Sequence, residues 1–493
     1  MPLVLPATSV TGVRPSAPLP ARGLLRGGSI VAGGMAVEVA SQLARTLILA
    51  RLLGAGEFGL VVSINTLVAV VELVGFIGVD RYIVYAPEGG SQAALDAGHT
   101  IAALRAVISA AIVLALAIPT AWLIGERANA GSFCWVAAVP LMRGAAHLGV
   151  VQMQRSGRFW PASASDGGGA ALGAVAAGVA AWLSPTHTAV LWGLGVQTGA
   201  ALVLTHWFAN ATPFRMSLDP RHIRDALRYG LPLMANGVAI TVASQLDRIV
   251  VGAWLGVAKL GLYGLCMTLV LQPIAQVLRL STTALQPPLS AAWHADPEGE
   301  FLRLARNFAG SVSLLATIGA AGAACLGAPL VTKLFGHTYA PSDAFFAFTA
   351  GALLLRLGRG GLNVLALSIG RTSDLMLSNL AGMSALPIMI IAMMLHPGIE
   401  AAAFGAMAGE LLAYGAGHVR LRRHCAAACD AFLKRFLVAM PVPVLLAGWI
   451  QATHPEWLAR VGVIACVLFG AAPVALREWR TARRVDPAVC PTA

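Results

Sequence analysis

Long apolar stretches alternate with short charged or Pro/Gly-rich segments along most of this 493-residue chain. Each stretch is about 18–25 residues long, which lets an α-helix cross a hydrocarbon core of about 30 Å. A backbone inside a membrane must satisfy its own polar groups, so these stretches predict helices. Fourteen spans are predicted, at 29–51, 58–79, 98–123, 131–153, 161–183, 187–209, 229–254, 259–284, 306–334, 343–368, 375–395, 399–419, 434–450 and 457–476.

Composition supports an all-α integral membrane protein. Hydrophobic residues make up 57% of the chain and charged residues only 11%, whereas a soluble domain carries about 25% charged residues. This excludes a compact water-soluble globule. The first 28 residues are rich in proline and lack the apolar core of a signal peptide, so we expect a disordered cytoplasmic leader there.

The distribution of cations predicts the orientation. If the N-terminus is cytoplasmic, 22 arginines and lysines fall in segments on the cytoplasmic side, and only Arg51, Arg127, Lys259, Lys333 and Arg460 fall on the other side. Such an asymmetry is the positive-inside rule, and it places both termini in the cytoplasm. The net charge of +12 is then explained by a basic cytoplasmic face beside anionic headgroups, without nucleic-acid binding.

One short pattern occurs twice. SQLAR at 41–45 matches SQLDR at 244–248, and LLGAGEFGL at 52–60 matches WLGVAKLGL at 254–262 once a one-residue deletion is allowed. Each copy runs from the first helix of a group of six through a tight turn into the second. Because both copies begin on the same side, they predict a parallel repeat of two six-helix lobes that enclose a cavity.

The repeat divides the chain into predicted parts. Two helices lie beyond the repeat and are expected to be additions to it. The parts are a leader (1–28), an N-terminal lobe (29–210), a basic linker (211–228), a C-terminal lobe (229–420), a basic loop (421–433), two extra helices (434–476) and a basic tail (477–493).

Charged side chains inside the predicted spans are the main candidates for function. An arginine near the middle of a membrane helix costs about 2.5–3.5 kcal/mol on insertion scales, so it should face protein or water. Helical spacing places several of these side chains in polar stripes, such as Glu38, Gln42 and Arg45 in the first span. The candidate substrate-binding residues are Arg45, Arg248, Arg279, Arg356, Arg359, Arg143, Gln42, Gln245 and Gln276.

The sign of these charges indicates the cargo. Seven arginines lie inside the spans with only five acids, Glu38, Glu72, Asp166, Asp247 and Glu410. Guanidinium groups match phosphate oxygens in pairs, so an anionic cargo is favoured. Structural pairing of arginines with acids, above all Glu72 and Glu410, is the alternative. Glu38 and Asp247 are the candidates for carrying a coupling proton or Na⁺.

Three segments resemble a known family. They are LARLLGAGEFGLVVSINTLVAVVELVGFIGVDRYIV at 49–84, RYGLPLMANGVAITVASQLDRIVVGAWLGVAKLGLYGLCMTLVLQPI at 228–274 and LQPPLSAAWHADPEGEFLRL at 285–304. They resemble the Wzx-like polysaccharide transport flippases of the multidrug/oligosaccharidyl-lipid/polysaccharide exporter superfamily. Arg45, Asp247 and Arg248 match recurrent charged positions of that family.

The resemblance implies a MATE-like, V-shaped fold of two lobes and a function in the inner membrane of a bacterium. It implies a flippase that moves undecaprenyl-pyrophosphate-linked oligosaccharide to the periplasm for exopolysaccharide, O-antigen or capsule synthesis. A polymerase and a chain-length regulator are possible partners, and a monomer is expected. We expect no cofactor and no metal.

Three other functions remain as alternatives. A cation-coupled drug or metabolite exporter of the same superfamily would require intramembrane acids rather than an excess of arginine. A lipid II-type flippase would also have two extra helices. A membrane polymerase or glycosyltransferase would need large loops, whereas no predicted outer loop exceeds about a dozen residues. No GxxxxGK[ST] phosphate-binding loop is present, so we expect no ATPase activity.

Overall fold

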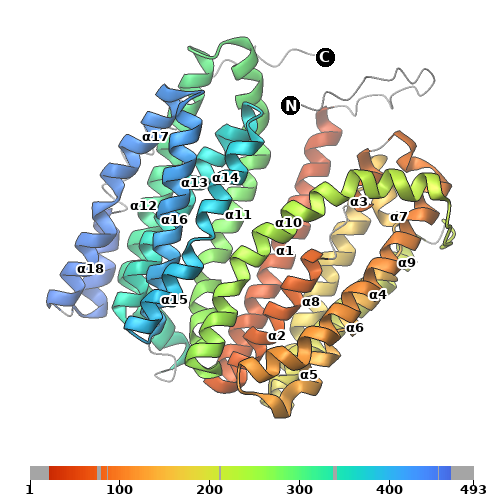
Figure 1. Ribbon diagram of the computed structural model, residues 1–493, viewed down its shortest axis with the longest axis horizontal. Helices are drawn as coiled ribbons and strands as arrows, with labels where there is room; N and C mark the ends of the chain where they lie inside the picture. The colour runs from red at the N-terminus through yellow and green to blue at the C-terminus, as the bar shows by residue number, and fades with distance from the viewer. Residues whose placement is uncertain are drawn as a thin grey trace. The chain divides into compact units, whose positions relative to one another are not determined.

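Every element of the described chain is helical in the computed structural model (Figure 1). The structure describes residues 21–74, 79–85, 87–209, 212–336, 341–453 and 455–467. Within these ranges, side-chain surroundings are described except at 21–29, 70–74, 81, 84–85, 87–88, 228–244, 272–277, 279–284, 287 and 372. Residues 1–20 of the predicted leader and the basic tail lie outside the described residues, and α1 begins within the predicted leader, at Ala21.

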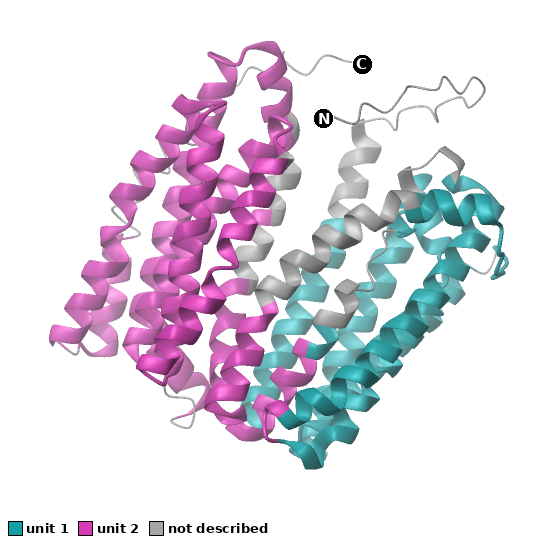
Figure 2. Cartoon of the chain, viewed as in Figure 1, with its two compact units in different colours: residues 1–52, 67–122, 126–241 teal, residues 53–66, 123–125, 242–493 magenta. Residues whose placement is uncertain are grey.

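The chain forms two compact units, which Figure 2 shows in different colours. Unit 1 comprises residues 1–52, 67–122 and 126–241, and unit 2 comprises 53–66, 123–125 and 242–493. The predicted lobe boundaries remain a prediction, because α2, α4 and α10 are each divided between the units.

The helices of unit 1 and the divided helices come first in the chain. They are α1 (Ala21–Leu52), α2 (Ala55–Val74), α3 (Val79–Tyr85), η1 (Pro87–Gly90), α4 (Gln92–Leu123), η2 (Arg127–Asn129), α5 (Ala130–Trp135), α6 (Ala138–Gly144), α7 (Gly149–Arg155), α8 (Trp160–Leu183), α9 (Thr188–Phe208) and α10 (Pro220–Leu255).

Unit 2 contains the remaining helices and a last helical segment at 457–467. They are α11 (Val257–Ala295), α12 (Glu300–Phe335), α13 (Asp343–Ser368), α14 (Thr372–Gly382), α15 (Ala385–Leu395), α16 (Ile399–Arg422), α17 (Ala426–Ala439) and α18 (Pro441–Thr453).

Seven helices of the described chain are long and apolar enough to cross a membrane, or eight if the bent pair Arg127–Gly144 and Gly149–Arg155 is one span. Each of the fourteen predicted spans overlaps a helix that the structure describes, but the number of membrane spans, fourteen, is not confirmed. The fourth span is broken, with a bend of 49° between its two parts. The thirteenth begins earlier than expected, since α17 includes the segment 426–433 that the sequence predicted as loop.

The repeated motif forms two helical hairpins whose glycines meet. Gly256, which joins α10 to α11, has φ +81°, a conformation that side-chain-bearing residues rarely adopt. Gly59 of the first copy packs directly on the carbonyl of Val257. Its equivalent in the second copy, Gly261, would place a Cβ 2.6 Å from the carbonyl oxygen of Ala55. The starts of α2 and α11 therefore approach so closely that only glycine fits at either position.

The Gly/Ala-rich fifth span is a continuous helix, α8, and its composition serves its packing. A Cβ on Gly173 would lie 2.6 Å from the carbonyl oxygen of Gly193 in α9, and a Cβ on Gly34 in α1 would lie 2.6 Å from the Cβ of Ser163. Small residues let membrane helices pack backbone against backbone. This close packing fixes α1, α8 and α9 of unit 1 together.

Candidate functional site

The second copy of the motif contains an internal polar link between α10 and α11. Tyr263 donates a hydrogen bond from its hydroxyl to Asp247 Oδ2 at 2.7 Å, and the ring of Tyr263 is fully buried. The other oxygen, Oδ1, accepts the backbone N–H of Arg248 at 2.8 Å. Both oxygens of Asp247 are therefore occupied, and the carboxylate stabilises the hairpin.

Arg248 follows Asp247 but does not share its contacts. Its guanidinium group is part-buried and makes no hydrogen bond or ion pair with the residues that the structure describes. Adjacent helical residues point about 100° apart, which explains why the two opposite charges do not pair. An unpaired guanidinium inside a membrane helix is a candidate for contact with an anionic ligand.

A second charged group lies where α13, α14 and α16 pack together. Arg359 donates to Glu410 from Nε at 2.8 Å and from Nη2 at 3.2 Å, and its Nη1 donates to Asn379 at 2.7 Å. Arg356 lies one turn earlier in α13, and its Nε is 3.4 Å from Glu410 Oε1. The side chain of Arg356 is 30% exposed, against 15% for Arg359. Glu410 thus binds Arg359 firmly and Arg356 loosely.

The sequence around these arginines gives α13 two different faces. Arg356 and Arg359 are three residues apart and lie on the same face. Gly358 and Gly361 lie on another, where the rings of Phe436 and Phe432 in α17 pack directly against them. The packing of α17 on this glycine face holds α13 in place and directs its two arginines toward Glu410.

Both groups lie near Tyr263 in unit 2, and together they are called the guanidinium network. Arg248 and Arg356 both lie within electrostatic range of the Tyr263 phenol. The network therefore contains three guanidinium groups, Arg248, Arg356 and Arg359, and two carboxylates, Asp247 and Glu410. Its formal charge is +1, and the two arginines with uncommitted donors are Arg248 and Arg356. Such a network can bind an anion with charge-assisted hydrogen bonds.

Unit 1 contains a separate polar stripe. Gln42 donates to Glu38 at 3.2 Å, and Arg45 donates from Nη1 to Gln197 of α9 at 2.8 Å. Asp166 in α8 lies within electrostatic range of Glu38 and Arg143. Glu38 and Asp166 are thus neighbouring carboxylates, an arrangement that can hold a proton or a small cation.

Three other candidates from the sequence make no described polar contact. Gln276 and Arg279 lie in α11, but their side chains are outside the described residues. Gln245 has a buried Oε1 without a hydrogen-bond partner in the structure. No contact tests a substrate-binding role for any candidate, and that role remains a prediction.

His147, which the sequence groups with Arg143, is a packed structural residue. Its Nδ1 accepts the backbone N–H of Gly149 at 2.9 Å, and its Nε2 lies 3.1 Å from the carbonyl oxygen of Thr212. Because both ring nitrogens are committed to the backbone, His147 connects the turn between α6 and α7 to the segment that begins the linker.

Tyr263, Asn379 and Gln197, which contact the charged candidates, were not among the predicted site residues. Tyr263 could have been found, since it lies seven residues after the Gly256 turn and Asp247 lies nine before it, at a similar height in the hairpin. Asn379 and Gln197 are distant in sequence from the arginines that they contact, and no spacing signal identifies them.

The described helices, seven of which are long and apolar enough to cross a membrane, define an all-helical, multi-span membrane protein. A family model described as "Polysaccharide biosynthesis protein" matches residues 48–344. The chain belongs to this family, as the resemblance of its three segments predicted. Among curated proteins, no sequence matches the chain.

Solved structures share the fold at low sequence identity. A lipid II flippase, MurJ, in an inward closed conformation is 12% identical, with a TM-score of 0.66 over 91% of this chain and 99% of that one. An inward-facing multidrug resistance MATE family transporter of the MOP superfamily is 14% identical, with a TM-score of 0.65 over 79% and 95%. A MOP superfamily transporter from Pyrococcus furiosus, described as having a binding pocket of reverse polarity, is 15% identical, with a TM-score of 0.51 over 83% and 96%. The predicted all-helical, MATE-like membrane fold is confirmed.

Proposed function

We propose that the chain is a flippase that moves undecaprenyl-pyrophosphate-linked oligosaccharide from the cytoplasmic to the periplasmic face of a bacterial inner membrane. The observation that carries the proposal is the excess of guanidinium groups in unit 2 of a chain from the polysaccharide biosynthesis family. The product supplies an exopolysaccharide, O-antigen or capsule pathway. The fold shared with a lipid II flippase supports a lipid-linked cargo.

In this proposal, Arg248 and Arg356 bind the pyrophosphate. Both have donors without partners among the described residues, and pyrophosphate offers several acceptor oxygens to planar guanidinium groups. Arg359 is committed to Glu410 and Asn379, so its main role is to fix Glu410 beside Arg356. Arg45, Arg143 and Arg279, with Gln42, Gln245 and Gln276, would line the path of the glycan.

Energy and sidedness complete the proposal. The neighbouring carboxylates Glu38 and Asp166 are better placed to carry a coupling proton or Na⁺ than Asp247, whose two oxygens are hydrogen-bonded. The distribution of cations supports a cytoplasmic position for both termini. A polymerase and a chain-length regulator would act on the product at the periplasmic face.

The experiment is deletion of the gene followed by extraction of lipid-linked oligosaccharide. We expect surface polysaccharide to be lost and finished repeat units to accumulate on the lipid carrier. Arg248→Ala should fail to complement, Arg248→Lys should complement in part, and Arg420→Ala, which removes an exposed arginine at the end of α16, should complement fully.

Two outcomes would reject the proposal. Normal export with new sensitivity to cationic dyes would favour a small-molecule exporter. Accumulation of the peptidoglycan precursor instead of a polysaccharide repeat unit would favour a lipid II-type flippase.

A further inference from the structure

A pocket of about 440 Å³ lies in unit 2, where the end of α12, the start of α13 and the helical segment 457–467 meet. Its lining residues are Ala328, Pro329, Thr332, Lys333, Asp343 and Arg460. The sequence predicts that this end of unit 2 is on the outer side of the membrane. The guanidinium network shares no residue with it.

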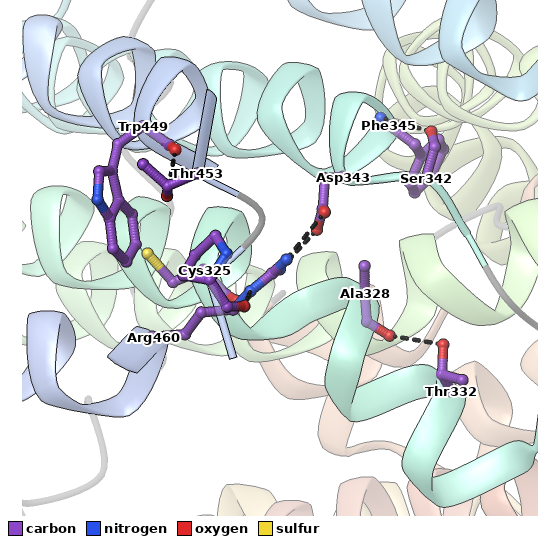
Figure 3. Close-up of polar contacts among 10 residues, drawn as sticks. Cys325, Ala328, Thr332, Ser342, Asp343, Phe345, Trp449, Thr453 and Arg460 are labelled. Carbon is purple, nitrogen blue, oxygen red and sulfur yellow. Dashed lines mark hydrogen bonds and ion pairs between the residues drawn. The ribbon is translucent and has the colours of Figure 1, made fainter. Parts of the chain in front are cut away.

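Arg460 forms one wall of the pocket and is structurally committed (Figure 3). Its Nη1 and Nη2 donate to the two oxygens of Asp343 at 2.7 and 3.0 Å, and its Nε donates to the carbonyl of Pro455 at 3.1 Å. The side chain is buried, with 8% of the residue exposed. Arg460 therefore connects the last described helical segment to α13, and Asp343 offsets its charge.

Pro329 explains a further contact of Arg460. Proline has no N–H, so the carbonyl of Cys325, four residues earlier in α12, loses its helical donor. Nη1 of Arg460 lies 3.4 Å from that carbonyl oxygen and compensates for the missing donor. With these contacts made, Arg460 has almost no donor left for a ligand.

Lys333 is the cation of this pocket that remains available. It is exposed, its ammonium group lies 5.2 Å from the centre of the Trp457 ring, and it makes no ion pair with a carboxylate in the described part of the chain. Because Asp343 neutralises Arg460, Lys333 gives the pocket a formal charge of +1. An ammonium group is a compact donor for phosphate.

We propose that this pocket binds the singly charged phosphodiester of a lipid headgroup in the outer leaflet. Tryptophan is enriched at the level of the headgroups, and Trp457 beside Lys333 places the pocket at that depth. Two of the five cations predicted on the outer side line this one pocket. A charge of +1 matches a phosphodiester better than a pyrophosphate, so the site differs from the one proposed for the cargo.

Native mass spectrometry of the purified full-length protein tests this inference. The delipidated protein is titrated with phosphatidylglycerol and with a diacylglycerol of the same acyl chains, which lacks the phosphate. We expect phosphatidylglycerol to bind to at least one site on the protein that requires Lys333. Lys333→Ala should weaken that site about ten-fold, the effect of losing one charge-assisted hydrogen bond, and Lys333→Arg should retain it.

Lys259→Ala is the matched control, since it removes another exposed cation from the same predicted side. Displacement of the lipid by inorganic phosphate, dependent on Lys333, would support the phosphate site and show that free phosphate also enters it. Equal binding of phosphatidylglycerol and diacylglycerol, or equal losses in the Lys333 and Lys259 variants, would overturn the inference. Thermal unfolding of each variant confirms that it is folded, and no transport assay is needed.

Discussion

The two copies of the motif differ at a matched pair of positions. The positions of Asp247 and Tyr263, which hydrogen-bond in the second copy, are occupied by Ala44 and Val61 in the first. A polar pair is replaced by an apolar pair, so neither copy contains one member of this pair without the other. This coordinated difference indicates that the Asp247–Tyr263 bond stabilises its hairpin.

Removing the Tyr263 hydroxyl tests this role. Tyr263→Phe should lower the free energy of unfolding by about 1–3 kcal/mol, because a hydrogen bond to a charged group is lost inside the membrane. Tyr414→Phe is the control, since the Tyr414 hydroxyl is also buried but has no hydrogen-bond partner in the structure. Thermal unfolding in detergent compares the two variants. Equal shifts in the melting temperature would contradict the role of the Asp247 bond.

The ion pair between Arg359 and Glu410 allows a second test at this scale. Glu410→Gln leaves two guanidinium groups without a counter-charge, and breaking a buried pair in this way costs about 3–5 kcal/mol. Arg359→Gln leaves Glu410 with Arg356 alone and should also destabilise. The double variant should be more stable than Glu410→Gln, as measured by the yield of folded protein and its melting temperature. Additive losses would show that the pair contributes no coupling.

At the scale of elements, the repeated hairpins explain why the sequence contains the same pattern twice. Gly59 and Gly261 occupy equivalent positions, and each lies against backbone at the start of the helix of the other copy. The repeat is thus used as a reciprocal contact between α2 and α11. Packing of this kind depends on small residues, because apolar lipid supplies no hydrophobic driving force between helices.

Enlarging one of these glycines tests the contact. Gly261→Val should separate α2 from α11, since even a Cβ would lie 2.6 Å from the carbonyl oxygen of Ala55. We expect a loss of folded protein of several-fold, consistent with overpacking costs of about 1–3 kcal/mol. Gly56→Ala, in the same segment with no neighbouring atom within 4 Å, should be tolerated. Equal yields of the two variants in membranes would argue against the contact.

The sequence predicted helices well and contacts poorly. Every span predicted from apolar length overlaps a helix that the structure describes, because hydropathy is a local property of the chain. The break within the fourth span and the early start of α17 were not predicted, since both depend on packing within a unit. Spacing placed Arg356 and Arg359 on one face, but only the fold shows that Glu410, 51 residues beyond Arg359, lies between them.

At the scale of the whole molecule, positive charge is found both in the predicted cytoplasmic segments and inside unit 2. Most cations lie in the predicted cytoplasmic segments. In unit 2, the described group of three arginines, Arg248, Arg356 and Arg359, contains only two carboxylates, Asp247 and Glu410. The network in unit 2 keeps a formal charge of +1 in a region where an unneutralised charge is costly. In the proposed function, this residual positive charge attracts an anionic group of the cargo.

Transport by the purified protein is the most direct test of the central claim. The protein is reconstituted into vesicles with lipid-linked oligosaccharide, and a membrane-impermeant glycosidase reports how fast the inner-leaflet glycan becomes accessible outside. We predict faster exposure than in protein-free vesicles, about ten-fold slower exposure with Arg248→Ala, and an unchanged rate with Arg420→Ala. Exposure no faster than in protein-free vesicles, with all three proteins folded, would contradict the account.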